Sequence, residues 1–232
     1  MTSTRHNPNQ IEAIVFDIGR VIVKLDPIRA LAHIAKMTAG RNGRAPKSAV
    51  NPEKDREKNK ALGRELYHAI QRDPMWVDWQ EGRVTPAEWH RKLCKRFNVK
   101  ASFADFRGAW NSTIVSEPEL LLPPRLFAQL HSRYRLVLLS NTDPLHVEHM
   151  RSNFRFLRHF DAAVFSCEIG ASKPSSRIFR AAVRAAETSP KQILFIDDIR
   201  EYAWAARRNG LQAIQFRNRF QLERELKQRA LL

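Results

Sequence analysis

A short apolar strand that ends in a carboxylate constrains this chain more than any other feature. Residues 11–16 have the length and apolar content of a buried strand, and Asp17 follows them directly. An ionised carboxylate at the end of a hydrophobic strand costs free energy unless nearby groups compensate its charge. In open α/β sheets, ligands bind at the carboxyl ends of the strands. We therefore predict that Asp17 is a nucleophile at a sheet edge and that later segments supply its partners.

The second half of the chain alternates between short apolar runs and helical patterns. Strands are predicted at 136–139, 162–165, 193–196 and 213–216, with an amphipathic helix between each pair. This alternation is typical of βαβ units, in which a parallel sheet is covered by helices on both faces. The predicted fold class is therefore α/β, with a Rossmann-like parallel sheet as its core.

The segment between the first two strands is predicted to be entirely helical. Thr85, Pro86 and Glu88 form a helix start signal, with Thr85 at the N-cap position. A helical block between two strands of another kind of domain indicates an insertion. We predict a helical cap at 28–115, and a core made of 1–27 and 116–232. Within the cap, residues 40–60 are rich in Gly, Pro and charge, which predicts a flexible basic segment or an arm that attracts anions.

Charge and composition restrict the partners and the location. The 232-residue chain carries a net charge of +16, which attracts phosphorylated metabolites, nucleic acid or anionic lipid. The basic residues are scattered, and no zinc-finger spacing or recognition helix is present, so nucleic acid is possible but not favoured. No apolar run reaches about 18 residues and no signal peptide is evident, so we expect no membrane partner. Two cysteines outside any CxxC pair indicate a cytoplasmic protein. The sequence does not specify the oligomeric state.

Polar residues of different chemistry follow several of the predicted strands. The carboxyl ends of parallel strands meet at one edge of a sheet, so these residues are expected to lie close together. They are Asp17, Ser140 with Asn141, Lys173, and Asp197 with Asp198.

This set of groups suits phosphoryl transfer through a covalent aspartyl phosphate. A carboxylate that attacks a phosphate monoester needs its charge repulsion neutralised, and Mg²⁺ does this with a few carboxylate oxygens and several waters. Asp17 and Asp198 offer such oxygens, and the main-chain carbonyl of Gly19 is placed to add another. Ser140, the N–H groups near Asn141 and the Lys173 ammonium can hold phosphate oxygens.

Four short motifs resemble those of the haloacid dehalogenase (HAD) superfamily, and the resemblance covers residues 11–216. They are Phe16-Asp17-Ile18-Gly19-Arg20-Val21-Ile22-Val23, Leu139-Ser140-Asn141-Thr142, Ser172-Lys173-Pro174 and Phe195-Ile196-Asp197-Asp198. The position of the helical block resembles subfamily IA, and the motifs are similar to those of a bacterial branch that includes α-glucose-1-phosphate phosphatases. The resemblance implies that Asp17 is the nucleophile, Ser140 binds phosphate and Lys173 steadies both. It also implies that Asp198 binds Mg²⁺ with Asp197 close by, and that the cap selects the substrate.

Gly19 departs from the pattern of most phosphatases in this superfamily, whereas Arg20 and the residues after Asp198 depart from the pattern of the similar branch. Gly19 stands where most of those phosphatases have a second Asp, a general acid of a kind that contributes about 10²- to 10⁴-fold. The branch that this chain resembles also has Gly there. The loss favours a leaving group that departs easily, such as a sugar C1 oxygen, or an acid from the cap or the substrate. Arg20 replaces the Asn that is usual in this branch, and it either grips substrate phosphate or points away.

Three functions are compatible with these residues. The first is a Mg²⁺-dependent phosphatase for a small phosphorylated metabolite, such as a sugar phosphate. The second is a metal-independent dehalogenase in which Asp17 attacks carbon, although a halide site gains nothing from the adjacent acids Asp197 and Asp198. The third is a catalytically weak or inactive relative that binds nucleic acid or a protein partner, as the missing general acid, Arg20 and the positive charge suggest.

Overall fold

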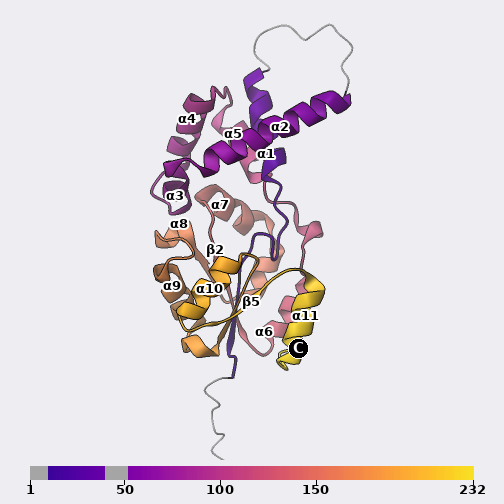
Figure 1. The fold of residues 1–232 in the computed structure, drawn as a ribbon, viewed down its shortest axis with the longest axis vertical. Coiled ribbons are helices and arrows are strands. Elements are labelled where there is room, and N and C mark those ends of the chain that lie inside the picture. Colours follow the sequence, from indigo (N-terminus) through magenta and orange to yellow (C-terminus); the bar gives the residue numbers. More distant parts are fainter. Residues whose placement is uncertain (1–9, 40–51) are drawn as a thin grey trace, which may run out of the picture.

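The core is a parallel five-stranded sheet (Figure 1). A computed structural model describes residues 10–39 and 52–232. The strand order is β3-β2-β1-β4-β5, and all four strand pairings are parallel. The strands are β1 (Ala13–Phe16), β2 (Arg135–Ser140), β3 (Ala162–Phe165), β4 (Ile193–Asp197) and β5 (Gln212–Gln215). This arrangement confirms the predicted α/β fold class.

Helices cover both faces of the sheet, and β1 is buried on both sides. Ile14 and Phe16 belong to one hydrophobic cluster, whereas Ala13 and Val15 belong to another, as the alternation of side chains along a strand requires. The first cluster includes α6 (Pro124–His131), α7 (Pro144–Asn153) and α11 (Arg219–Gln228). The second includes α9 (Ser176–Ala186) and α10 (Arg200–Arg208). Shorter elements are α8 (Ser166–Ile169), η1 (Glu117–Glu119), η2 (Arg155–His159) and η3 (Pro190–Gln192).

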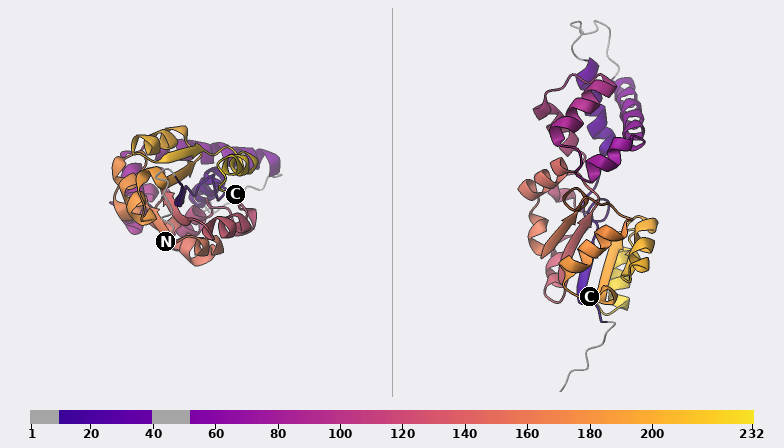
Figure 2. Two further views of the ribbon diagram at one scale, coloured as in Figure 1. Left: turned by 90° about the horizontal axis from the view of Figure 1, so that it is seen from below. Right: turned by 90° about the vertical axis from the view of Figure 1, so that its left-hand side faces the viewer.

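Five further helices form a second lobe above the carboxyl ends of the strands (Figure 2). They are α1 (Pro27–Ala39), α2 (Pro52–Gln71), α3 (Pro74–Gln80), α4 (Pro86–Phe97) and α5 (Phe103–Asn111). The lobe has its own hydrophobic cluster, in which the rings of Trp79 and Trp89 stack 5.3 Å apart. The helical cap is thus part of the fold, and the limits 28 and 115 stay a prediction. Within the described residues, no helix is both long enough and apolar enough to cross a membrane.

The prediction of one flexible segment at 40–60 is wrong for its second half. Helix α2 begins at Pro52 and includes the charged residues up to 60. Lys and Glu are good helix formers, and Glu57 and Lys60, three residues apart, form an ion pair of 2.9 Å. The remaining part of that segment, residues 40–51, lies outside the described residues.

A glycine allows α1 and α2 to pack closely. A Cβ atom at Gly63 in α2 would lie 2.4 Å from the main-chain oxygen of Ile28 and 3.1 Å from the Cβ of Ala32. Both neighbours belong to α1, and a main-chain oxygen cannot move without displacing the helix. Gly63 is therefore required by the contact between these two helices.

We expect Gly63→Ala to lower the free energy of unfolding by about 1–3 kcal/mol, because the added methyl group forces the helices apart. Gly108→Ala is the matched control. Gly108 is also helical, a Cβ there meets nothing within 4 Å, and the change should stabilise by up to about 1 kcal/mol. Urea unfolding of both variants measures the difference, and equal effects would contradict the packing argument.

Candidate active site

Three neighbouring strands bring the predicted site residues to the same edge of the sheet. Phe16 in β1 is in register with Leu138 in β2 and with Ile196 in β4. The main-chain N–H of Asp17 donates to the carbonyl of Ile196 at 2.9 Å, which extends the pairing by one residue. Asp17 therefore lies at the level of Asp197, and Ser140 ends β2 one step beyond. The sheet register itself assembles the site.

A buried ammonium group lies at the centre of the site. Lys173 is 3% exposed, and its Nζ donates to Asp17 Oδ1 at 2.7 Å and to Asp197 Oδ2 at 2.7 Å. The third donor is directed to the carbonyl of Leu139 at 3.2 Å. An ammonium group has three donors, so each finds an acceptor. Lys173 thus fixes the orientation of the Asp17 carboxylate.

Asn141 positions Lys173 through the main chain. Its Oδ1 accepts from the Lys173 N–H at 2.7 Å, and its Nδ2 donates to the Lys173 carbonyl at 3.0 Å. The same Nδ2 lies 3.4 Å from the hydroxyl of Tyr202, whose ring centroid is 5.1 Å from Lys173 Nζ. The amide of Asn141 is therefore engaged by protein, and its predicted phosphate contact stays a prediction.

Three carboxylates form a cluster that could hold a metal ion. One ligand atom from each of Asp17, Asp197 and Asp198 lies within 4.8 Å of the others. Asp197 is fully buried, and its oxygens accept from Lys173 Nζ and from the main-chain N–H of Ile199 at 2.8 Å. The second oxygen of Asp17 and the half-buried Asp198 are better placed for a cation. We predicted from the sequence that Asp198 binds the metal ion and that Asp197 lies close by. This geometry is compatible with those roles, which stay predictions.

The three carboxylates carry more negative charge than the single Lys173 ammonium can neutralise, and their pKa values reflect this excess. Burial raises the pKa of Asp17 to about 7; Lys173 opposes this rise, and the charges of Asp197 and Asp198 add to it. The pKa of Asp198 is also raised, first by burial and then by Asp197, while Arg20 opposes the rise. Burial alone would lower the pKa of Lys173, but Asp17 and Asp197 raise it above its ordinary value. A bound cation would relieve the excess negative charge.

The loop after Asp17 places Gly19 against the side chain of Leu25. A Cβ atom at Gly19 would lie 2.9 Å from Leu25 Cδ1, the flexible end of that side chain, so a larger residue there would require Leu25 to shift. The loop closes on itself where the Arg20 N–H donates to the Val23 carbonyl at 2.8 Å, with Arg20 at a φ of 61°. Arg20 is exposed, and its positive charge opposes the rise in the pKa of Asp198. Ser140 is buried at the end of β2. The predicted ligand roles of these three residues stay predictions.

Comparison with known proteins identifies the family. A model of haloacid dehalogenase-like hydrolases matches residues 11–210. The chain belongs to this family of hydrolases.

The similar proteins differ in how much of their length this hydrolase covers. It is 24% identical over 195 residues to a D-ribitol-5-phosphate phosphatase from Bacteroides thetaiotaomicron, covering 81% of this chain and 83% of that protein. It is 22% identical over 174 residues to a drimenol cyclase from Aspergillus calidoustus, covering 72% of this chain but only 31% of that protein. Among solved structures, a HAD family enzyme from B. thetaiotaomicron has a TM-score of 0.71 at 23% identity, covering 90% of this chain and 95% of that chain. A second structure of that enzyme holds magnesium and inorganic phosphate.

Several residues around the site of this HAD-like hydrolase do not follow from the strand-end pattern. Glu81, in the turn after α3, accepts from the Ser172 N–H at 3.0 Å, next to Lys173. Asp143 caps α7, as its sequence position suggests, and its second oxygen accepts from Trp110 Nε1 at 3.1 Å. Tyr202 is four residues beyond Asp198, in the first turn of α10, and that spacing is the signal that could have found it. The cap thus contacts both loops that carry site residues.

We expect the Asp17 carboxyl of metal-free protein to titrate near pH 7 rather than near pH 4, because burial and two acids disfavour its charge. Lys173→Met should raise the midpoint further, since the ammonium is the group that lowers it. Carbon-13 NMR of labelled aspartate measures both midpoints, with Asp17→Asn for assignment and the exposed Lys191→Met as control. A wild-type midpoint near 4 would contradict the described cluster.

Proposed function

We propose that this hydrolase is a Mg²⁺-dependent phosphatase that acts on a small phosphorylated metabolite, such as a sugar phosphate, through an aspartyl phosphate. The cluster of Asp17, Lys173 and Asp198 carries the proposal, because it joins a nucleophile, a cation and spare carboxylate oxygens at one sheet edge. The similarity to a D-ribitol-5-phosphate phosphatase supports it, as does the structural neighbour that holds magnesium and phosphate.

In the proposed reaction, the free oxygen of Asp17 attacks phosphorus, and the bond between phosphorus and the leaving oxygen breaks. Lys173 holds the other oxygen of Asp17 at 2.7 Å and so presents the nucleophile in one orientation. Ser140 and Arg20 are proposed to bind phosphate oxygens. Water then attacks the aspartyl phosphate, which releases inorganic phosphate and restores Asp17.

Asp17, Asp198 and the carbonyl of Gly19 are proposed to hold Mg²⁺. Carboxylate and carbonyl oxygens are the ligands that this ion prefers, and the cluster has more acids than Lys173 can neutralise. When bound, Mg²⁺ would neutralise the charge shared by the nucleophile and the phosphate.

The glycine at position 19 shapes the proposed substrate range, because it has no side chain that could protonate the leaving oxygen. The enzyme is therefore proposed to favour esters of the more acidic hydroxyl groups, such as the C1 hydroxyl of a sugar over the other hydroxyls of that sugar. The three-acid cluster also favours a cation over the halide that the dehalogenase alternative requires.

The free thiols of Cys94 and Cys167 support the proposed cytoplasmic location.

We expect purified protein to hydrolyse p-nitrophenyl phosphate with Mg²⁺ and to lose this activity with EDTA. Asp17→Asn should lower kcat/KM about a thousandfold or more, because the nucleophile is removed. Glu148→Gln, an isosteric change on the exposed surface of α7, is the control. Wild-type protein that is inactive over a broad phosphate panel, or an active Asp17→Asn variant, would overturn the proposed function. Chloride release from 2-chloropropionate without metal would favour the dehalogenase.

We expect kcat/KM for phenyl phosphate to be about a hundredfold or more below that for p-nitrophenyl phosphate, because phenolate needs a proton that no residue at position 19 supplies. The double variant Gly19→Asp with Leu25→Ala restores an acid and the space for it, and it should narrow the gap. Leu25→Ala alone is the control. Similar rates for both esters in wild-type protein would show that another group donates the proton.

A further inference from the structure

A cationic cavity lies in the cap, outside the cluster of acids. It measures about 790 Å³ and is bounded by α1, the middle of α2 and the end of α5. Its described lining carries His33 and the single carboxylate of Asp26, together with four permanently cationic side chains: Arg29, Lys36, Lys60 and Arg64. An excess of positive charge in a concave site attracts anions more strongly than the same charges on an open surface.

Two of these cations have no acidic partner among the residues that the structure describes. Arg29 lies 3.6 Å from a carboxylate oxygen of Asp26, and Lys60 pairs with Glu57. Lys36 and Arg64 form no ion pair within the described parts of the chain. Their charges are therefore available to a ligand in the cavity.

A second cavity, beside the loop that follows Asp17, shares part of its lining with the first. It measures about 430 Å³ and lies between the loop after Asp17 and η1, and Asp26 and Arg29 line both cavities. Arg20 lines the second one, and its charge reaches Asp198 in the acid cluster. The two cavities therefore adjoin at Asp26 and Arg29, and together they are called the α1–α2 groove; Glu119, which pairs with Lys24, also lines the second one.

We propose that the α1–α2 groove binds a second phosphate group of the substrate, so that the enzyme acts on small bisphosphorylated molecules. This proposal rests on the proposed phosphatase function, because one phosphate must react at Asp17. Arg29 and Lys36 are seven residues apart on α1, or about 10 Å at 1.5 Å per residue. Lys and Arg form charge-assisted hydrogen bonds with phosphate oxygens, so these cations suit the second phosphate of a small molecule such as a sugar or nucleoside bisphosphate.

The lining favours a small molecule over a nucleic acid. No Phe, Tyr or Trp is among the described residues that line the larger cavity, so it offers none of the ring surfaces on which bases commonly stack.

Calorimetry with two non-hydrolysable probes tests the groove without relying on turnover. Hexane-1,6-bisphosphonate and hexylphosphonate differ by one anionic group, and each is titrated into Mg²⁺-loaded protein at fixed free Mg²⁺. We expect wild-type protein to bind the bisphosphonate about tenfold or more tightly. The double variant Lys36→Glu with Arg64→Glu should bring the ratio of the two Kd values close to 1. Lys36→Gln with Arg64→Gln repeats the test if charge reversal disturbs folding.

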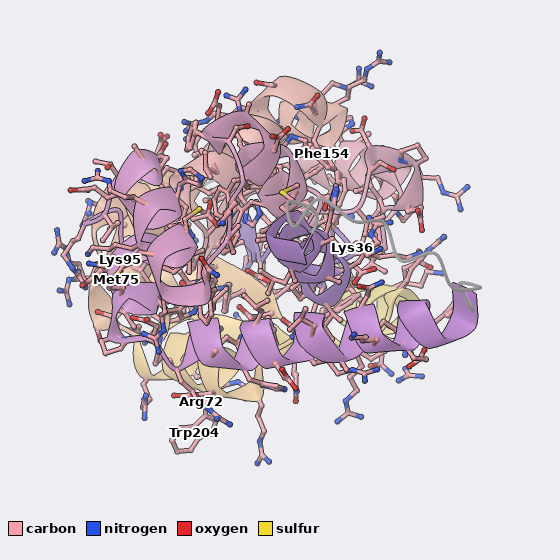
Figure 3. All side chains as sticks on the ribbon, turned by 90° about the horizontal axis from the view of Figure 1, so that it is seen from above. Lys36, Arg72, Met75, Lys95, Phe154 and Trp204 are labelled. Atoms are coloured by element: carbon pink, nitrogen blue, oxygen red, sulfur yellow. The ribbon has the colours of Figure 1, made fainter. Side chains whose placement is uncertain are left out.

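The control variant carries the same charge change on another helix of the cap. Arg91→Glu with Lys95→Glu alters α4, and Figure 3 shows Lys95 well separated from Lys36 on α1. This variant should keep the wild-type ratio. The proposal would be overturned if the ratio of the two Kd values is near 1 in wild-type protein, also with propane and decane bisphosphonates. It would also be overturned if the control variant loses the preference for the bisphosphonate to the same extent.

Two other outcomes distinguish this proposal from nucleic-acid binding and from the proposed phosphatase function. In the first, a single-stranded DNA 20-mer binds to wild-type protein and to the control variant but not to the Lys36 and Arg64 double variant, and the ratio of the two Kd values is near 1. The groove then binds nucleic acid, and the proposal is wrong. If the bisphosphonate preference is present but p-nitrophenyl phosphate is not hydrolysed, the groove is supported as a bisphosphate site and the phosphatase function fails.

Discussion

The structure depends on one buried ammonium group placed between two carboxylates. Lys173 contacts Asp17 after β1 and Asp197 at the end of β4, and both contacts are 2.7 Å long and shielded from water. Removing Lys173 alone would leave two buried carboxylates without their cation, which is far more costly than losing an exposed pair. The same interaction that makes the carboxyl edge of the sheet stable therefore also holds Asp17, the proposed nucleophile, in place.

The cap is connected to this centre through the loops that carry it. Glu81 bonds the main chain beside Lys173, and Trp110 bonds Asp143 three residues after Ser140. The Ser166 hydroxyl, close to these loops, also donates to the carbonyl of Gln80 at 2.6 Å. A shift of the cap relative to the core would strain all three contacts at once. The cap thus contributes to the position of the site loops as well as covering them.

The sequence was sufficient for the sheet and the strand-end residues, because both follow from local rules. Apolar runs predict strands, parallel strands share an edge, and a polar residue after a buried strand has few reasons to be there. The side-chain partners could not be predicted in the same way. That Asn141 holds the Lys173 main chain, or that Leu25 occupies the space beside Gly19, depends on contacts between segments that the chain order does not specify. Helix α2 was missed at its start because its charged residues were interpreted as a sign of disorder rather than as helix formers.

Gly19 and Arg20 are neighbours on the loop after Asp17. Gly19 has no side chain that could protonate a leaving group, so the proposed phosphatase would depend on leaving groups of low basicity. Arg20 opposes the rise in the pKa of Asp198, and it also lines the cavity that adjoins α1 at Asp26 and Arg29. In the proposed bisphosphate complex, binding energy from the remote phosphate would be used to orient the ester at Asp17. The loop after Asp17 would then couple the choice of leaving group to the recognition of a second charge.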